Sequence, residues 1–152
     1  MLNSDYRDML SALSAEGVEF LVVGAFAMAA HGLTRATRDI DFWIRPSRDN
    51  AEKTWRALKC FGAPLFDLSI DDLSEPDNVF QIGVAPRRID LLTAISGVGF
   101  DDAWKNRVSV TLWGMQFSVL SREDLIANKL AAGRPKDLAD VAWLQQDTEN
   151  KP

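Results

Sequence analysis

Two aspartates stand one residue apart inside an apolar segment, and this placement restricts the fold more than any other feature. The segment DIDFWI, residues 39–44, carries Asp39 and Asp41 among isoleucine, phenylalanine and tryptophan. Because side chains alternate between the faces of a strand, both carboxylates point the same way, and Ile40 and Phe42 point to the other face. Two like charges this close raise the pKa of at least one carboxyl and cost stability unless a cation neutralises them.

The aspartate pair has two interpretations. A strand that carries D-x-D is suited to Mg²⁺, which binds one or two carboxylates together with phosphate oxygens and water. Alternatively, the pair lies on a solvent-facing edge and forms ion pairs with Arg35, Arg38 or Arg45. The spacing of the two acids alone does not separate these interpretations.

Hydrophobic periodicity and turn residues predict alternating helices and strands around this segment. Strands are expected at 18–24, 39–45, 78–85, 87–94, 108–114 and 115–120. Helices are expected at 4–15, 24–32, 47–62, 99–107, 121–133 and 136–146, with a loop that holds a short helical turn at 63–77. This order predicts an α+β (α/β-like) fold, a mixed β-sheet flanked by helices with a C-terminal helix pair. We expect one domain over residues 1–147 and a frayed tail at 148–152.

Composition excludes several classes of protein. The net charge of −5 disfavours a non-specific nucleic-acid binder, and the single histidine excludes a site built from several histidine ligands. The longest apolar stretch, residues 20–30, is too short to cross a bilayer, so we expect no membrane association and no secretory signal. The lone cysteine, Cys60, fits a reducing cytoplasm. Neither G-x-G-x-x-G nor a P-loop motif occurs.

Two further features favour the metal interpretation. Asp90 lies in RRIDLLTA, another apolar strand, and if that strand neighbours 39–45 all three carboxylates converge. Gly24 lies where a strand gives way to a helix, and there a glycine lets the backbone approach a phosphate beside unpaired helix N–H groups. Two metal ions held by three carboxylates suit in-line phosphoryl or nucleotidyl displacement.

These residues together resemble the nucleotidyltransferase superfamily, whose fold is shared by DNA polymerase beta, kanamycin nucleotidyltransferase and small minimal nucleotidyltransferases. The family pattern is a hydrophobic residue, Gly, and Gly or Ser, followed after a spacer by Asp, hydrophobic, Asp or Glu, hydrophobic. Here it reads Val23-Gly24-Ala25 and then Asp39-Ile40-Asp41-Phe42, and the later family carboxylate matches Asp90. The match covers residues 18–93.

The resemblance implies a catalytic and metal-binding triad of Asp39, Asp41 and Asp90 with two Mg²⁺ ions. It implies transfer of a nucleoside monophosphate from an NTP to an acceptor hydroxyl on tRNA, a protein or a small molecule. Gly24 and Ala25 are expected to bind the triphosphate through backbone N–H groups. Arg35 and Arg38 either hold the triphosphate or acceptor, or balance the acids.

Residues 123–144, EDLIANKLAAGRPKDLADVAWL, resemble a bacterial subset of these proteins, the AbiEii toxin type of toxin–antitoxin and phage-defence loci. This resemblance implies a nucleotide-binding role for Lys129, with a solvated surface position as the alternative. For Arg134, Lys136 and Asp137 it implies a part in shaping the site, and an ion-paired helix connection is the alternative. An antitoxin-type protein partner is implied as well.

Ala25 departs from the family pattern. It stands where the family usually has serine or glycine, so a hydroxyl contact to the triphosphate is lost while the backbone N–H remains. The alternative function is therefore a catalytically weak or inactive nucleotidyltransferase-fold protein that binds a nucleotide or a partner.

Overall fold

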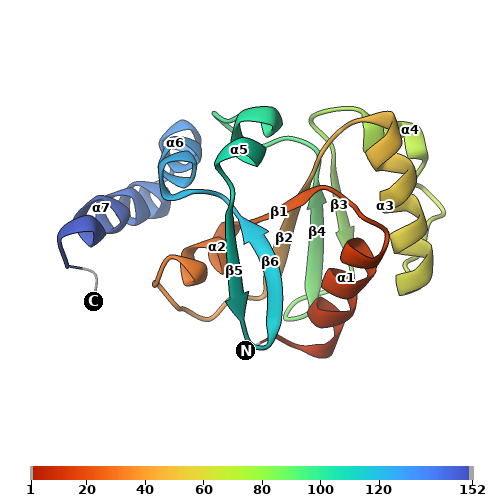
Figure 1. Ribbon diagram of the computed structural model, residues 1–152, viewed down its shortest axis with the longest axis horizontal. Helices are drawn as coiled ribbons and strands as arrows, with labels where there is room; N and C mark the ends of the chain where they lie inside the picture. The colour runs from red at the N-terminus through yellow and green to blue at the C-terminus, as the bar shows by residue number, and fades with distance from the viewer. Residues whose placement is uncertain (1, 151–152) are drawn as a thin grey trace.

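A mixed six-stranded sheet forms the centre of the molecule, with strands in the order β3-β4-β2-β1-β6-β5 (Figure 1). The computed structural model describes the backbone of residues 2–150 and the side chains of residues 2–146. The strands are β1 (Phe20–Val23), β2 (Asp39–Ile44), β3 (Val79–Ile82), β4 (Arg88–Leu92), β5 (Val108–Leu112) and β6 (Met115–Val119). Pairs β2–β4 and β1–β6 are parallel, and the other neighbours are antiparallel. The predicted α+β fold with a mixed sheet is confirmed.

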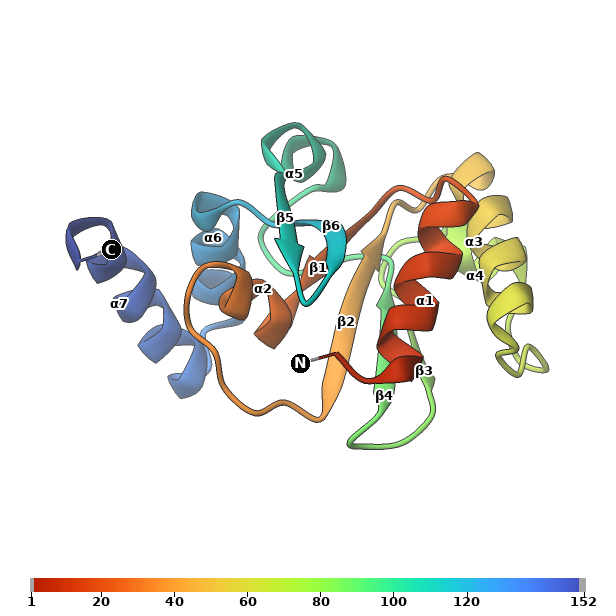
Figure 2. The ribbon, with the colours of Figure 1, turned by 60° about the horizontal axis from the view of Figure 1, so that its bottom comes forward.

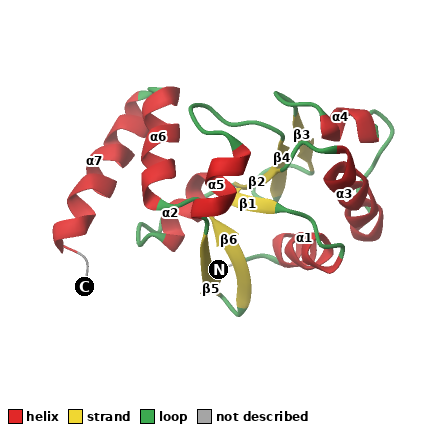
Figure 3. Cartoon of the chain, turned by 45° about the horizontal axis from the view of Figure 1, so that its top comes forward, coloured by secondary structure: helices red, strands yellow, loops and turns green. Residues whose placement is uncertain are grey.

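The helices gather in two groups (Figure 2). Beside the β3–β4 half of the sheet lie α1 (Ser4–Ala15), α3 (Arg48–Phe61) and the short α4 (Ile70–Ser74). At the other end, α2 (Gly24–Ala30) lies next to the pair α6 (Arg122–Ala132) and α7 (Pro135–Asn150), and α5 (Phe100–Asn106) lies over the middle (Figure 3). The predicted C-terminal helix pair is present. Its second helix continues past the predicted end at 146 to Asn150, so the predicted tail is helical over 148–150, and 151–152 lie outside the described residues.

Local signals in the sequence explain where the elements begin and end. The side chains of Ser47 and Ser121 accept hydrogen bonds from the backbone at the starts of α3 and α6. Gly133 ends α6 in the left-handed conformation that glycine adopts without strain. Trp113 and Gly114 both have positive φ and close the β5–β6 hairpin at the predicted position.

Strand β2 is covered on both faces beyond its first residues. Phe42 is fully buried and makes an edge contact with Phe20 of the neighbouring β1, with 5.6 Å between ring centroids. On the opposite face, the buried Trp43 makes an edge contact with Phe100 of α5 at 5.0 Å. Because this packing fixes the strand, the aspartates at its start are held in a defined position.

Candidate active site

The three predicted carboxylates meet at the start of two parallel strands. Strand β2 pairs with β4 so that Asp41 lies opposite Asp90 and Asp39 lies opposite Arg88. One carboxylate oxygen from each of Asp39, Asp41 and Asp90 lies within 4.8 Å of the others. Because β2 is a central strand between β4 and β1, the solvent-edge interpretation of the aspartate pair is wrong.

Gly24 packs directly against this carboxylate cluster. It follows β1, begins α2 and has a φ of +69°. A Cβ atom added to it would lie 2.3 Å from Asp41 Oδ2, closer than any non-bonded contact allows. The position therefore requires glycine for two reasons, its left-handed backbone and the absence of a side chain.

The surroundings of Asp41 raise the pKa of its carboxyl group. Burial, and then the charges of Asp39 and Asp90, raise the pKa of Asp41 to about 7, and the nearby Arg88 only partly opposes this shift. The carboxyl is thus partly protonated at neutral pH in the metal-free protein. A bound divalent cation would favour its charged form.

Arg88 occupies part of the space between the acids. Its guanidinium donates to Asp39 Oδ2 at 2.6 Å and to Asp90 Oδ2 at 3.2 Å. The other oxygen of Asp90, Oδ1, is buried and makes no hydrogen bond, although Arg88 Nε lies 3.2 Å away. Three converging carboxylates offer the hard oxygen donors that suit Mg²⁺.

A cleft of about 500 Å³ opens beside the cluster. Its lining includes six cationic side chains and four carboxylates, although the whole chain has a net charge of −5. The cations are Arg35, Arg38, Arg88, Lys129, Arg134 and Lys136, and the carboxylates are Asp39, Asp41, Asp137 and Asp140. Local charge in the cleft is therefore opposite in sign to that of the molecule, which suits a polyanionic ligand.

Lys129 is held in the cleft by two aspartates of α7. It is only 7% exposed, and its Nζ lies 2.8 Å from Asp140 Oδ2 and 3.8 Å from Asp137 Oδ1. The solvated surface position considered for Lys129 is therefore wrong. Arg35 also binds Asp140, through two hydrogen bonds of 2.9 and 2.8 Å, so its charge is balanced by α7 rather than by the aspartates of β2.

The remaining predicted cations differ in whether a carboxylate pairs with them. Arg134 binds Asp137 through its Nε at 2.6 Å and its backbone N–H at 3.2 Å, which is the predicted ion-paired connection between α6 and α7. Arg38 and Lys136 are exposed at the cleft and pair with no carboxylate within the described part of the chain. These two side chains are available to a ligand.

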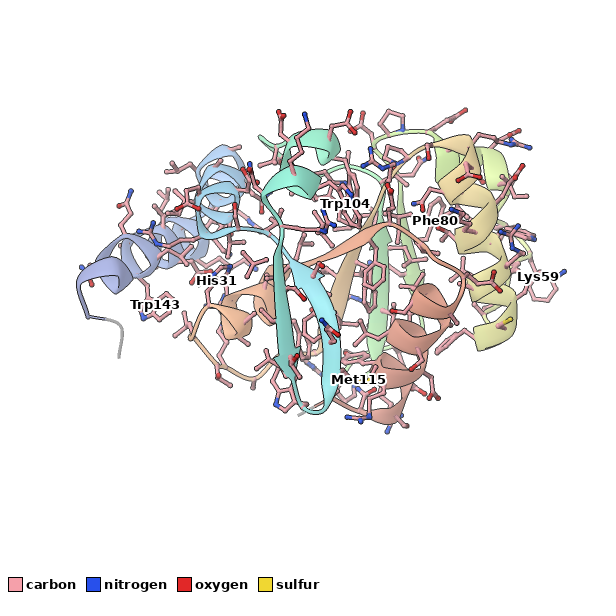
Figure 4. All side chains as sticks on the ribbon, in the orientation of Figure 1. His31, Lys59, Phe80, Trp104, Met115 and Trp143 are labelled. Carbon is pink, nitrogen blue, oxygen red and sulfur yellow. The ribbon has the colours of Figure 1, made fainter. Side chains whose placement is uncertain are left out.

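His31 does not contribute to the cleft. At the end of α2 its Nε2 lies 2.8 Å from the backbone oxygen of Leu120, which precedes α6 (Figure 4). This contact joins α2 to the start of the C-terminal helix pair.

Sequence comparison assigns a family to this arrangement. The profile of the family described as nucleotidyl transferase of unknown function (DUF2204) matches residues 2–151. The chain belongs to this family of nucleotidyl transferases. No curated protein matches it in sequence.

Solved structures share the fold of this nucleotidyl transferase. TM1012 from Thermotoga maritima, assigned as a nucleotidyltransferase, has a TM-score of 0.62 at 19% identity over 96% of both chains. ANT(2″)-Ia, in complex with adenylyl-2″-tobramycin, has a TM-score of 0.59 at 13% identity, over 95% of this chain and 87% of its own. The lincosamide antibiotic adenylyltransferase LnuA, with lincomycin bound, has a TM-score of 0.59 at 14% identity, over 95% of this chain and 97% of its own.

The predicted set of site residues for this nucleotidyl transferase omitted Arg88 and Asp140. Arg88 stands two residues before Asp90, so strand alternation places both on one face, and this signal was present in the sequence. Asp140 lies three residues after Asp137 on α7, one helical turn along, but its partners Lys129 and Arg35 come from distant segments. Its role becomes visible only when these segments come together.

None of the helices in the described part of this nucleotidyl transferase has the length and apolar content needed to cross a membrane.

Proposed function

We propose that the chain is a Mg²⁺-dependent nucleotidyltransferase that moves a nucleoside monophosphate from an NTP to an acceptor hydroxyl. The observation that supports this proposal most strongly is the convergence of Asp39, Asp41 and Asp90 within 4.8 Å, beside a cleft whose lining has more cations than carboxylates. In the reaction the hydroxyl oxygen forms a bond to the α-phosphorus. The bond between the α-phosphorus and the oxygen that bridges it to the β-phosphorus breaks, and pyrophosphate leaves.

The carboxylates have distinct roles in this proposal. Asp39 and Asp41 would hold two Mg²⁺ ions, and Asp90 would share one of them. When bound, Mg²⁺ neutralises triphosphate charge and lowers the pKa of the acceptor hydroxyl. Asp90 would take the hydroxyl proton at its buried Oδ1, which makes no hydrogen bond within the protein.

The triphosphate would lie along the cationic cleft. Backbone N–H groups of Gly24 and Ala25 would contact it where α2 begins. Arg38 and Lys136 would reach it directly, since neither has a carboxylate partner among the described residues. Arg35 and Lys129 would present charge from fixed positions, because Asp140 holds both.

Among tRNA, a protein hydroxyl and a small molecule, a small-molecule acceptor has the most support. Two structural neighbours are antibiotic-modifying proteins with tobramycin adenylylated or lincomycin bound, and their folds match over 95% of this chain. A place in a bacterial toxin–antitoxin or phage-defence system, with an antitoxin-type partner and a cytoplasmic location, remains a proposal from the AbiEii-type resemblance. The genes adjacent to this one would test it.

Two measurements test the proposed function. Titration calorimetry should show Mg²⁺-dependent NTP binding to the wild-type protein and at least about a tenfold loss in Asp41→Asn, because a bridging charge is removed. Transfer of label from α-labelled NTPs to candidate acceptors should occur with the wild-type protein and disappear in Asp39→Ala.

Unchanged NTP affinity in Asp41→Asn would contradict the metal assignment. Intact binding without label transfer would favour the alternative, a binding module in which Ala25 has replaced the family hydroxyl.

A further inference from the structure

A second hollow, the aromatic recess, adjoins the catalytic cleft. It has a volume of about 220 Å³. Tyr6 of α1, Phe26 of α2 and Trp113 at the tip of the β5–β6 hairpin line it. In Figure 2 the tip of the β5–β6 hairpin lies between α1 and α2, and residues 34–37 of the loop before β2 complete the lining.

The aromatic wall of the recess is built in advance of any ligand. Phe26 makes edge contacts with Tyr6 and with Trp113, each with ring centroids 5.6 Å apart. The Tyr6 hydroxyl donates to the backbone oxygen of Pro86 at 3.1 Å, and Arg7 donates to the backbone oxygen of Trp113 at 2.7 Å. Because each contact fixes the next ring, the recess needs little ordering when a ligand binds.

The recess and the catalytic cleft share part of their walls. Ala25, Arg35, Ala36 and Thr37 line both. The two hollows are therefore adjacent, and one molecule with a group at the carboxylate cluster is close enough to place a second group in the recess. Ala25 lies at this boundary, and its side chain is a single methyl group.

The lining of the recess selects against charge. Within the described residues no carboxylate lines it, and the guanidinium of its one cation, Arg35, is bound to Asp140. A polycationic acceptor would find no counter-charge here. The volume is below the roughly 300–1,000 Å³ of pockets that enclose a whole small molecule, so it suits one ring of a larger ligand.

We propose that the aromatic recess is a subsite for one uncharged flat ring of a reactant in nucleotidyl transfer. This inference rests on the proposed function. The ring has two sources, the base of the NTP or an aromatic ring on the hydroxyl-bearing acceptor. In either case it packs against the Tyr6–Phe26–Trp113 wall while the rest of the molecule extends past Ala25 to the carboxylates.

Two variants change the recess without touching the carboxylate cluster. Ala29→Met fills it from α2 with a good helix former, and Ala29 lines the recess but not the cleft. Trp113→Asn removes one ring and keeps a residue that tolerates the positive φ of 51° at this position. Trp104→Ala is the control, because it removes a half-buried indole of α5 that lines neither hollow.

Titration calorimetry with Mg²⁺ measures the dissociation constants of tripolyphosphate and of the α,β-methylene analogues of ATP, GTP, CTP and UTP. Saturation-transfer NMR with benzyl alcohol reports an aromatic acceptor ring. If the base enters the recess, Ala29→Met and Trp113→Asn weaken at least one analogue by about fivefold or more, the loss of one stacked ring, with tripolyphosphate unchanged. If the acceptor ring enters, analogue affinities stay unchanged and saturation transfer to benzyl alcohol is lost in both variants.

The proposal is overturned if both recess variants match Trp104→Ala in analogue affinity and in benzyl alcohol contact. In that case Mg²⁺-dependent tripolyphosphate binding still stands, so the proposed function survives. If wild-type protein binds no tripolyphosphate with Mg²⁺, the proposed function fails, and the assignment of the recess falls with it.

Discussion

Gly24 packs against Asp41, so this contact in the carboxylate cluster joins a backbone to a carboxylate. The absence of a Cβ at Gly24 is what allows Asp41 Oδ2 to lie where it does. The family glycine therefore has a steric role toward the second aspartate in addition to its role beside a phosphate.

Replacement of Gly24 by alanine separates this steric role from backbone strain. Gly24→Ala and Gly17→Ala both place alanine at a φ near +70°, but a Cβ at Gly17 meets nothing within 4 Å. Each should lose about 1–2 kcal/mol of unfolding free energy from the left-handed backbone. Gly24→Ala should lose about 1–3 kcal/mol more from the clash with Asp41, together with Mg²⁺-dependent NTP binding. Urea unfolding and calorimetry measure both, and equal stability of the two variants would refute the steric role.

The raised pKa of Asp41 predicts a pH dependence of stability. With a folded pKa of about 7 against 3.8 unfolded, the folded protein binds the extra proton between these values, so stability falls as pH rises from about 4 to about 7. The loss is at most about 4 kcal/mol. In Mg²⁺-free buffer, Asp41→Asn should flatten this slope and be more stable than wild type at pH 8. Urea titrations at several pH values measure it, and parallel curves for the two proteins would exclude the shift.

At the scale of elements, an ion pair joins the C-terminal helix pair to the loop that leads into β2. Asp140 of α7 binds Lys129 of α6 and Arg35 of the loop before β2. Burial acts to raise the pKa of Asp140, but hydrogen bonds from Arg35 and Lys129 outweigh it and lower the pKa below its usual value. The pairing thus fixes both cations that we expect to face the triphosphate.

Removal of the Asp140 charge should be costly because its partner Lys129 is buried. Asp140→Asn leaves the Lys129 ammonium with Asp137 at 3.8 Å as its nearest described carboxylate, and should lower the unfolding free energy by about 3 kcal/mol. Asp101→Asn is the matched control, because Asp101 is 81% exposed and pairs with Arg45, and its effect should stay within about 1 kcal/mol. Chemical denaturation compares them, and similar losses in both variants would show that the Asp140 network does not stabilise the fold.

At the scale of the whole molecule, the cleft joins segments from both ends of the chain. Its lining comes from α2, the loop before β2, strands β2 and β4, and the C-terminal helix pair. A ligand in the cleft therefore contacts α2, the C-terminal helix pair and the central sheet, so its binding energy is coupled to the stability of the packed fold.

This coupling predicts ligand-dependent thermal stability. With Mg²⁺ and NTP at about 100 times the dissociation constant, the folded state gains about 2.7 kcal/mol, which corresponds to a rise in Tm of ~5–10 °C for a chain of this size. Differential scanning calorimetry measures the rise, and NTP with EDTA in place of Mg²⁺ is the control. An equal rise with EDTA would show that the triphosphate binds without the metal.

The sequence by itself determined the local features of the fold and the chemistry of the cluster. Caps at Ser47 and Ser121 and the alternation in DIDFWI are properties of neighbouring residues, so helices, strands and the shared direction of Asp39 and Asp41 were readable from them. Asp39, Asp41, Asp90 and Gly24 were also predictable as members of one cluster, because residue type and spacing indicate them.

Only the tertiary structure decided which distant groups meet. The parallel register that sets Asp41 beside Asp90, the ion pairs of Asp140 with Lys129 and Arg35, and the aromatic recess all join segments far apart in the chain. Such contacts depend on how the sheet and the helices pack as a whole. Since that packing is the sum of many weak interactions, no short stretch of sequence encodes it.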